Sequence, residues 1–169
     1  GQTKLEELPC NIKNIVDEVE VIIQGQAQEK TQTFIVDTSK VKDYYIYCDR
    51  LRVKEVLVNL LGNAVKFTSV GGMINIRVSE NPCSKEGYAS YSFSVKDNGI
   101  GMNLSSFDDI ISGRCEGHFG LYSVKRCLEL VCGKDYSFSA ESEPGKGTAI
   151  IIEYDAGNIS KDTGAGSPT

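Results

Sequence analysis

The sequence predicts an α/β fold, a sandwich of two layers in which helices cover one face of a mixed, mostly antiparallel sheet. Some segments repeat apolar residues at helical spacing, whereas shorter ones alternate apolar and polar residues as half-buried strands do. The two kinds of segment are interleaved along the chain, and such elements pack as layers around one core. With 169 residues and 40% hydrophobic content, the chain is long enough for one substantial core.

Three helices and six strands are expected. The first helix covers 11–27, with its apolar stripe at Ile12, Ile15, Val16, Val19 and Ile23. The second begins after Asp49, a good capping residue, and ends before Gly71 and Gly72; the third covers 122–131. The strands are expected at 31–36, 44–48, 73–79, 88–96, 136–142 and 148–154. We expect one domain over 1–155 and a disordered tail over 156–169, which has almost no apolar residues.

Composition excludes some classes of function. A net charge of -5 argues against a nucleic-acid-binding protein, for which a basic face is expected. The sequence has no apolar run of membrane-spanning length and no signal sequence, so we expect no membrane contact by this chain. Its six cysteines form no Cys-x-x-Cys pair, so free thiols in a reducing cytoplasm are expected.

The second helix carries a polar face. Asn59, Asn63 and Lys66 are separated by four and three residues, so they share one side of the helix while the aliphatic residues share the other. Two amide oxygens and one ammonium can converge there on a phosphate chain with its Mg²⁺. Taken alone, the pattern also fits an amphipathic helix with incidental polar residues.

A glycine-rich turn follows the alternating strand that ends at Lys96. Gly99 and Gly101 permit backbone conformations closed to other residues and let a ligand lie against the main chain. Asp97 then stands at the strand end, where its carboxylate can accept a hydrogen bond from an amino group such as that of adenine. An Asn-Gly turn joining two strands is the alternative for this segment alone.

Two further segments carry glycines, one just before a predicted helix and one in a turn between two predicted strands. Gly117, His118 and Gly120 precede a helix whose apolar residues are Leu121, Val124, Leu128 and Val131. A glycine-bearing loop that opens a helix offers free amides and the positive end of the helix dipole to an anion. The last segment, 143–148, is a tight turn between two β-rich runs.

In this order, the four segments resemble the nucleotide-binding motifs of the histidine kinase catalytic domain. That domain is a branch of the ATPase superfamily that also contains gyrases, heat-shock chaperones and mismatch-repair ATPases. The resemblance covers nearly the whole chain, and the segment 8–30 is similar to the family's leading helix. It implies the Bergerat-type ATP-binding fold, with ATP and Mg²⁺ as cofactors.

The resemblance also implies roles for the residues of the second helix and of the phosphate loop. Asn63 corresponds to the family's magnesium-binding Asn, and Asn59 to its companion one turn earlier. Lys66 resembles the residue that touches phosphate, and Phe67 the aromatic that lies against the base. The residues expected beside the phosphates are Gly117, His118, Gly120 and Leu121.

By the same resemblance, residues at the ends of two strands are expected to contact the adenine base. Asp97 corresponds to the carboxylate that accepts from the adenine amine, and Gly99 and Gly101 to the glycines of the pocket floor. Thr148 assists from the last hairpin. The segment between Met102 and Gly117 would be the lid, and Arg114 is the lid cation expected to neutralise the γ-phosphate.

Asn59 indicates the kind of reaction. Hydrolytic members of the superfamily carry a Glu one turn before the magnesium Asn to activate water, and an Asn cannot act as that base. Glu55 lies two turns before Asn63, roughly 10 Å away along the helix, so we interpret it as a solvated or salt-bridged residue. Phosphoryl transfer needs mainly positioning and charge neutralisation, so the expected acceptor is a histidine brought from elsewhere.

The only histidine of the chain, His118, lies in the phosphate loop and lacks the acidic neighbour usual at a phosphoacceptor site. It has three readings: a donor to phosphate, a solvated imidazole, or a metal ligand together with Cys115. We therefore expect the chain to act on a separate histidine phosphoacceptor and dimerisation domain of the same full-length protein. That protein would be a homodimer, cytoplasmic in this portion, with a response regulator downstream. The alternative is a module that senses ATP or ADP without transferring phosphate.

Overall fold

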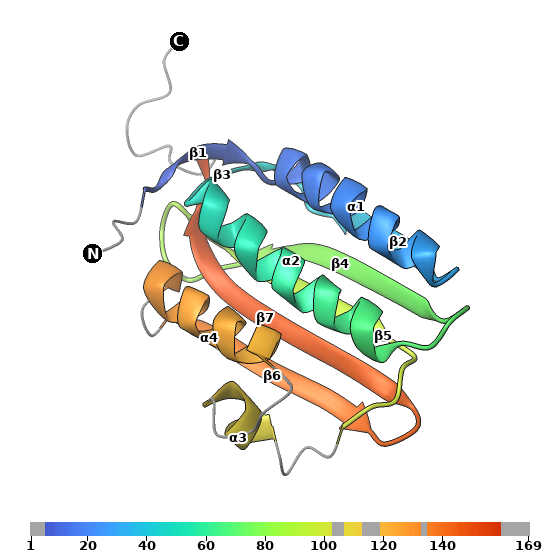
Figure 1. Ribbon diagram of the computed structural model, residues 1–169. Coiled ribbons are helices and arrows are strands. Elements are labelled where there is room, and N and C mark those ends of the chain that lie inside the picture. The colour runs from blue at the N-terminus through green and yellow to red at the C-terminus, as the bar shows by residue number, and fades with distance from the viewer. Residues whose placement is uncertain (1–5, 103–106, 113–118, 133–134, 160–169) are drawn as a thin grey trace.

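The computed structural model describes residues 6–102, 107–112, 119–132 and 135–159, and its main feature is one large sheet. This sheet has five strands in the order β2-β4-β5-β7-β6 (Figure 1). Only β2 and β4 run parallel; the other neighbours are antiparallel. The strands are β2 (Thr33–Lys40), β4 (Met73–Pro82), β5 (Tyr88–Asp97), β6 (Tyr136–Glu143) and β7 (Gly147–Gly157).

Helices cover one face of this sheet (Figure 1). They are α1 (Ile12–Glu29), α2 (Arg50–Phe67) and α4 (Phe119–Cys132), and a short helix, α3 (Phe107–Ile111), packs beside α4. The buried faces of helices and strands form one hydrophobic cluster between the two layers. The predicted two-layer α/β sandwich is thereby confirmed. Helix α3 was not predicted; it forms in the lid segment, where Phe107 and Ile110 are buried.

A small sheet closes one end of the molecule. It pairs β1 (Leu8–Asn11) with β3 (Tyr45–Cys48) in antiparallel fashion. The expected helix over 11–27 is confirmed to within a few residues, whereas residues 8–11 of the segment that resembles the family's leading helix do not join it. Asn11 caps the helix instead, since its side-chain oxygen accepts from the amides of Lys13 and Asn14, and Pro9 favours an extended residue before it.

The last strand extends beyond the expected end of the domain at residue 155. Ala156 still pairs with Ala89, and Gly157 with Tyr88. Asn158 is fully buried, where its amide donates to the Tyr91 hydroxyl at 2.7 Å. The ordered part of the chain thus includes residues 156–158, because strand pairing continues through small residues whose composition alone suggested a tail.

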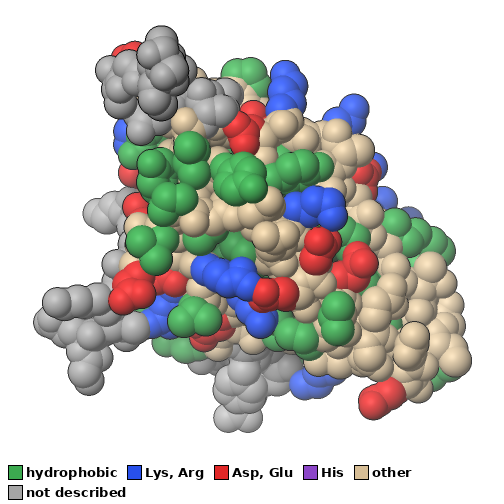
Figure 2. All heavy atoms as spheres, turned by 90° about the horizontal axis from the view of Figure 1, so that it is seen from above, with side chains coloured by type: hydrophobic (Ala, Val, Ile, Leu, Met, Phe, Trp, Pro, Cys, Tyr) green, Lys and Arg blue, Asp and Glu red, His purple; other side chains and the backbone are tan. Residues whose placement is uncertain are grey.

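Charged residues join α1 to the start of α2. Glu18 on α1 forms ion pairs with Arg50 and with Lys54, the latter at 3.4 Å, and the Arg50 hydrogen bond is the main reason why the pKa of Glu18 is lowered. Figure 2 shows the molecule from the side of β1 and α1, where acidic, basic and hydrophobic side chains are interspersed. Neither sign of charge predominates on the part of this face that the structure describes.

Candidate functional site

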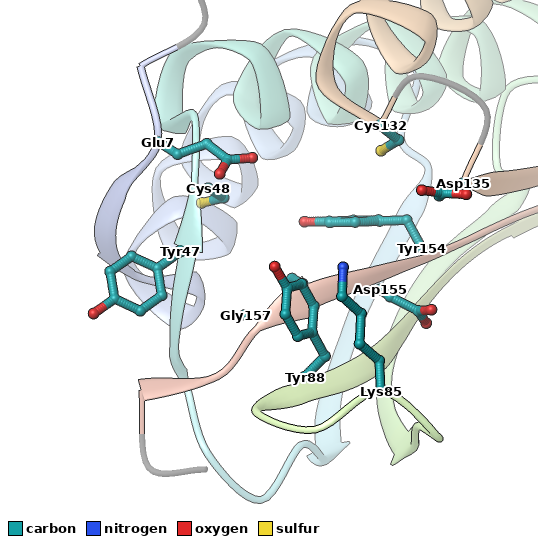
Figure 3. A pocket seen from close by; sticks show the side chains of 11 residues that line it. Glu7, Tyr47, Cys48, Lys85, Tyr88, Cys132, Asp135, Tyr154, Asp155 and Gly157 are labelled. Atoms are coloured by element: carbon teal, nitrogen blue, oxygen red, sulfur yellow. The ribbon is translucent and has the colours of Figure 1, made fainter. Parts of the chain in front are cut away.

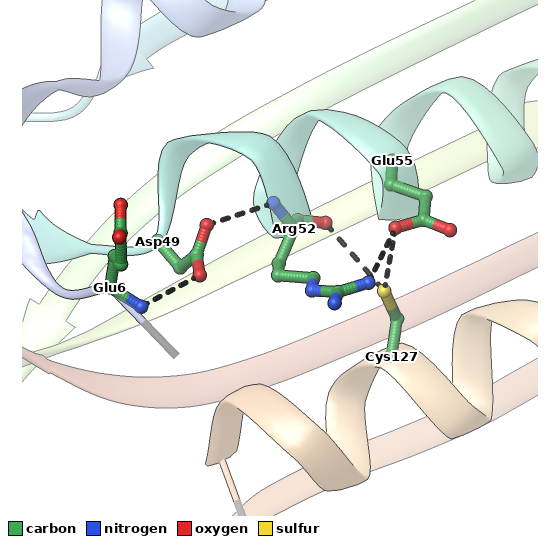
Figure 4. Close-up of polar contacts among 5 residues, drawn as sticks. All are labelled: Glu6, Asp49, Arg52, Glu55 and Cys127. Atoms are coloured by element: carbon green, nitrogen blue, oxygen red, sulfur yellow. Dashed lines mark hydrogen bonds and ion pairs between the residues drawn. The ribbon is translucent and has the colours of Figure 1, made fainter. Parts of the chain in front are cut away.

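Helix α2 supplies one wall of the candidate site, and its N-terminal end is fixed by Asp49. The Asp49 carboxylate is buried and accepts from the amides of Arg52 at 3.2 Å and Glu6 at 3.0 Å (Figure 4). A side chain that accepts from the first turn satisfies donors that the helix itself leaves free. Residue 49 therefore sets where the helix begins.

Glu55 lies near this end and is engaged in structural contacts. The Arg52 guanidinium is 3.2 Å from Glu55 Oε2, and the Cys127 thiol donates to the same oxygen at 3.4 Å (Figure 4). Burial and the neighbouring Glu55 raise the pKa of Cys127 to about 11, so the thiol keeps the proton that it donates. The interpretation of Glu55 as a salt-bridged residue is confirmed.

The C-terminal end of α2 is held by two side chains from the turn after α1. The Lys30 ammonium donates to the carbonyls of Val65 at 2.8 Å and Thr68 at 2.6 Å. The Gln32 amide donates to the same two carbonyls, at 3.1 and 2.8 Å. These contacts satisfy acceptors that a helix end leaves unpaired, so the last turn of α2 is fixed in position.

The glycine-rich turn after β5 lies directly against this end of α2. The amide of Ile100 donates to the carbonyl of Phe67 at 3.2 Å. A Cβ at Gly99 would lie 2.3 Å from that same carbonyl oxygen, which a larger residue could not tolerate. The amide of Gly99 donates at 2.9 Å to Asp97 Oδ1 and so orients the carboxylate.

The turn between β6 and β7 packs on the other side of the same loop. The amide of Gly145 donates to the carbonyl of Ile100 at 2.6 Å. Gly101 has a φ of +71°, and a Cβ there would lie 2.0 Å from the carbonyl oxygen of Glu143. The loop after Asp97 is therefore held between a helix end and a hairpin turn, and the spacing leaves room only for glycine.

A serine that the sequence analysis did not single out joins these parts. The Ser142 hydroxyl accepts from the amide of Met102 at 2.8 Å, and it lies 2.8 Å from the carbonyl oxygen of Gly147 and 2.9 Å from the Thr148 hydroxyl. Its position one residue before the predicted turn was the available signal. The alternation of apolar and polar residues along β6 does not distinguish Ser142 from the other serines of that strand.

These elements enclose a pocket of about 480 Å³, its open mouth included, between α2 and the strand ends. The lining residues are Leu60, Asn63, Ala64, Phe67, Val95, Asp97, Ile100, Gly101, Met102, Leu121, Thr148 and Ile150. Most are apolar, and the polar side chains among them are those of Asn63, Asp97 and Thr148. Apolar walls with a few convergent polar groups are typical of sites for small organic ligands and cofactors.

Two of the polar groups have unusual surroundings. Burial raises the pKa of Asp97, and hydrogen bonds from the backbone of Gly99 and Thr148 partly offset this rise. Asn63 Nδ2 is buried and has no hydrogen-bond partner among the described residues. A buried polar group without a partner is costly, so an amide in this state suits a site completed by a ligand.

The pocket brings together six of the residues predicted for nucleotide binding: Asn63, Phe67, Asp97, Gly101, Leu121 and Thr148. Gly99 is not part of the lining, but its amide donates to the Asp97 carboxylate. Asn59 and Lys66 are on the same helix but outside the lining; Asn59 is half-buried, and exposed Lys66 places its ammonium 5.3 Å from the Phe67 ring centroid.

The remaining predicted residues belong to the segment that leads into α4 and to the start of that helix. Gly120 lies in the first turn of that helix. Arg114, Gly117 and His118 lie outside the described residues, as does Cys115.

A second cavity lies at the other end of β7 and contains none of the predicted site residues (Figure 3). It measures about 860 Å³ with its open mouth and is lined by Glu7, Tyr47, Cys48, Lys85, Tyr88, Cys132, Asp135, Tyr154, Asp155, Ala156 and Gly157. Burial raises the pKa of Cys132 to about 12 and also raises that of Cys48. Both thiols are therefore protonated and unreactive at neutral pH.

The predicted free thiols are confirmed at the described cysteines, which are Cys10, Cys48, Cys83, Cys127 and Cys132. Within the described part of the chain, no helix has the length and apolar character needed to cross a membrane.

The sequence of this chain is similar to sensor kinases. It is 26% identical over 163 residues to the sensor protein GacS of Pseudomonas syringae pv. syringae, covering 90% of this chain and 17% of GacS. It is 32% identical over 151 residues to the hybrid signal transduction histidine kinase K of Dictyostelium discoideum, covering 79% of this chain and 12% of that protein. The chain thus spans less than a fifth of the length of either relative.

Solved structures show the same fold at lower identity. The catalytic domain of histidine kinase ThkA matches with a TM-score of 0.74 at 23% identity, over 88% of this chain and 95% of that one. Full-length ShkA in complex with AMPPNP matches with a TM-score of 0.76 at 23% identity, over 94% of this chain and 33% of ShkA.

The family model of histidine kinase-, DNA gyrase B- and HSP90-like ATPases matches residues 48–158. This range runs from the end of β3 to the end of β7 and contains α2, the Asp97 loop and the whole lining of the pocket between them. The chain therefore belongs to the family of histidine kinase-, DNA gyrase B- and HSP90-like ATPases.

Proposed function

We propose that this chain binds Mg·ATP in the pocket between α2 and the Asp97 loop and transfers the γ-phosphoryl group to a histidine. That histidine would belong to a separate dimerisation and phosphoacceptor domain of the same full-length protein, a cytoplasmic homodimer in this portion. The observation that carries the proposal is the pocket itself, whose mostly apolar lining includes the partly buried carboxylate of Asp97 and the buried, unpaired Nδ2 of Asn63.

The base of the nucleotide fits the end of the pocket formed by Asp97 and Thr148. Asp97 accepts from an exocyclic amino group, and the half-buried ring of Phe67 provides an apolar surface for the purine. The carboxylate is already oriented by Gly99, so it loses little freedom when it binds the base.

The phosphates and the metal would lie along the polar side of α2. Asn63 and Asn59 carry amide oxygens of the kind that Mg²⁺ accepts, and the unpaired Asn63 Nδ2, which is a donor, fits a phosphate oxygen. The ion, when bound, neutralises charge on the phosphates. Lys66 is exposed and can reach toward a phosphate oxygen, while Arg114, Gly117, His118, Gly120 and Leu121 would border the phosphates from the lid and α4.

The polar face of α2 has no general base that could activate water, and this supports transfer of the phosphoryl group to a nucleophile from another domain. Asn59 cannot deprotonate water, and the carboxylate of Glu55 is bonded to Arg52 and Cys127. The relatives are named as a sensor protein and a hybrid signal transduction histidine kinase, and histidine kinase ThkA has been solved with the response regulator TrrA. We infer that a response regulator receives the phosphoryl group after the acceptor histidine does.

The test is to mix this chain with the phosphoacceptor domain of its own full-length protein and ATP labelled at the γ-position. We expect acid-labile, alkali-stable label on the acceptor domain, no label when the α-phosphate is labelled instead, and a large loss with Asn63→Ala. Tight nucleotide binding without any phosphohistidine would contradict transfer and would indicate a nucleotide-sensing module.

A further inference from the structure

The three hydrogen-bonding neighbours of Ser142 Oγ, two oxygens and one amide nitrogen, fix where the hydroxyl protons lie. Ser142 Oγ is 2.8 Å from the carbonyl oxygen of Gly147 and 2.9 Å from the hydroxyl of Thr148, and it accepts from the amide of Met102. A serine hydroxyl has one proton to donate and two lone pairs with which to accept. Its single proton must therefore go to one of its two oxygen neighbours.

The Gly147 carbonyl determines which neighbour receives it. A carbonyl oxygen can only accept, so its 2.8 Å contact with Ser142 is a hydrogen bond only if the serine supplies the proton. The contact between Ser142 and Thr148 is then made by the proton of Thr148. The Thr148 hydroxyl has no second proton, so toward the pocket it can only accept.

Asp97 presents acceptors from the adjacent strand. Asp97 and Thr148 are paired across β5 and β7, and both line the same pocket. Two acceptors side by side favour a ligand group that donates, such as the amino group at C6 of adenine. They disfavour the carbonyl that hypoxanthine and guanine carry at that position, because acceptors facing each other are left unpaired.

We propose that Ser142 is a positioning residue that sets the purine selectivity of the pocket, by holding the Thr148 proton away from the base. The proposal rests on the proposed function, since it presumes that a purine nucleotide occupies this pocket. Ser142 itself does not line the pocket and acts through Thr148.

The experiment compares ADP with inosine diphosphate, which carries a carbonyl in place of the amino group at C6 and, as a consequence, a proton on N1. Their dissociation constants are measured by calorimetry for the wild type and for Ser142→Ala. Without Ser142, the Thr148 hydroxyl can turn and donate to the inosine carbonyl. We expect the preference for ADP to fall about tenfold, which corresponds to about 1.4 kcal/mol.

The ratio of the two affinities separates selectivity from structure. Loss of the Met102 contact in Ser142→Ala weakens the loop for both ligands, but it leaves their ratio unchanged. Ser139→Ala, at an exposed serine of the same strand, is the matched control and should change neither affinity. In a Thr148→Val background, Ser142→Ala should no longer change the ratio, because the hydroxyl that it releases is gone.

The outcomes are distinct. ADP binding with an unchanged ratio in Ser142→Ala overturns the inference and leaves the proposed function standing. A wild type that binds neither nucleotide overturns the proposed function instead. If Ser142→Ala does not fold, Ser142→Cys, a weaker donor of similar size, should give an intermediate ratio, and a wild-type ratio there overturns the inference.

Discussion

The two ends of helix α2 are held in different ways. At the N-terminal end, Asp49 caps the helix from the position next to it in sequence. At the C-terminal end, the carbonyls are bonded by Lys30 and Gln32, more than thirty residues away, and by the amide of Ile100. The first end is a local structure, whereas the second exists only in the folded chain, and it is the second that borders the pocket.

This difference implies a division of labour along one helix. Changes near Asp49 should affect stability alone, because nothing at that end faces the pocket. Changes around the C-terminal end should affect stability and nucleotide binding together, since Phe67 and Ile100 meet there.

The largest effect is expected for Asp97→Asn. The substitution replaces a carboxylate acceptor by an amide that can present a donor to the adenine amine, and hydrogen bonds to charged groups are worth about 1.5–3 kcal/mol. We expect ADP affinity to fall by on the order of a hundredfold. Calorimetry measures it, with the exposed Lys96→Met at the preceding residue as a control that should remain near wild type. Unchanged ADP affinity would refute the proposal that Asp97 binds the adenine base in this pocket.

Lys30→Met should come next and would test the C-terminal end of α2 directly. It leaves the carbonyls of Val65 and Thr68 with fewer donors, so unfolding free energy should fall by about 2 kcal/mol in denaturant titrations. Nucleotide affinity should fall as well, and the Ile100 amide should exchange its hydrogen faster than the rest of β5. Lys40→Met, at an exposed lysine of β2, is the matched control. Loss of stability with normal affinity and normal Ile100 exchange would show that the two ends do not differ.

Asp49→Ala should destabilise the other end without affecting binding. Removal of an N-cap costs about 1 kcal/mol on average, and the amides of Arg52 and Glu6 lose their acceptor. The denaturation midpoint should therefore decrease while ADP affinity, measured well below it, stays at the wild-type value. Asp49→Asn, which keeps an acceptor, should recover most of the stability. A matching decrease in affinity would contradict the division of labour.

The pH dependence of stability without nucleotide gives a smaller effect. Burial raises the folded-state pKa of Asp97 above its unfolded value, so the folded state holds the proton more tightly. This group therefore favours folding at low pH, and its contribution declines as pH rises from the ordinary Asp pKa, near 4, through the folded-state value. Asp97→Asn should remove that decline in melting temperature between pH 4 and neutrality, as thermal scans would reveal. A wild-type profile in the variant would mean that another group is responsible.

Glu55→Gln should have the smallest effect. Its ion pair with Arg52 is half exposed, and such pairs contribute well under 1 kcal/mol. Phosphotransfer and ADP affinity should be unchanged, because this carboxylate is not the base. A loss of phosphotransfer at normal affinity would mean that Glu55 takes part in the chemistry after all.

Local patterns were sufficient to predict most of the elements. The apolar stripe of α1, the Asp49 cap and the alternation in β5 depend on neighbours within a few residues, and the structure keeps all three. The same reasoning missed β1 and α3, since a four-residue strand and a five-residue helix are defined by what they pack against. It also ended the domain too early, because the pairing partner of Ala156 is Ala89, 67 residues earlier.

The candidate site shows the same difference between what local sequence predicts and what tertiary contacts decide. The sequence by itself determined the candidates for nucleotide binding: Asn63 on a polar helix face, Asp97 before glycines, and Thr148 after a tight turn. Only the tertiary structure decided that these side chains meet in one pocket, that Asn63 keeps an unpaired amide, and that Ser142 directs the Thr148 hydroxyl. The physical reason is that the identity of a residue fixes what it can donate or accept, whereas its partners depend on contacts between segments far apart in the chain.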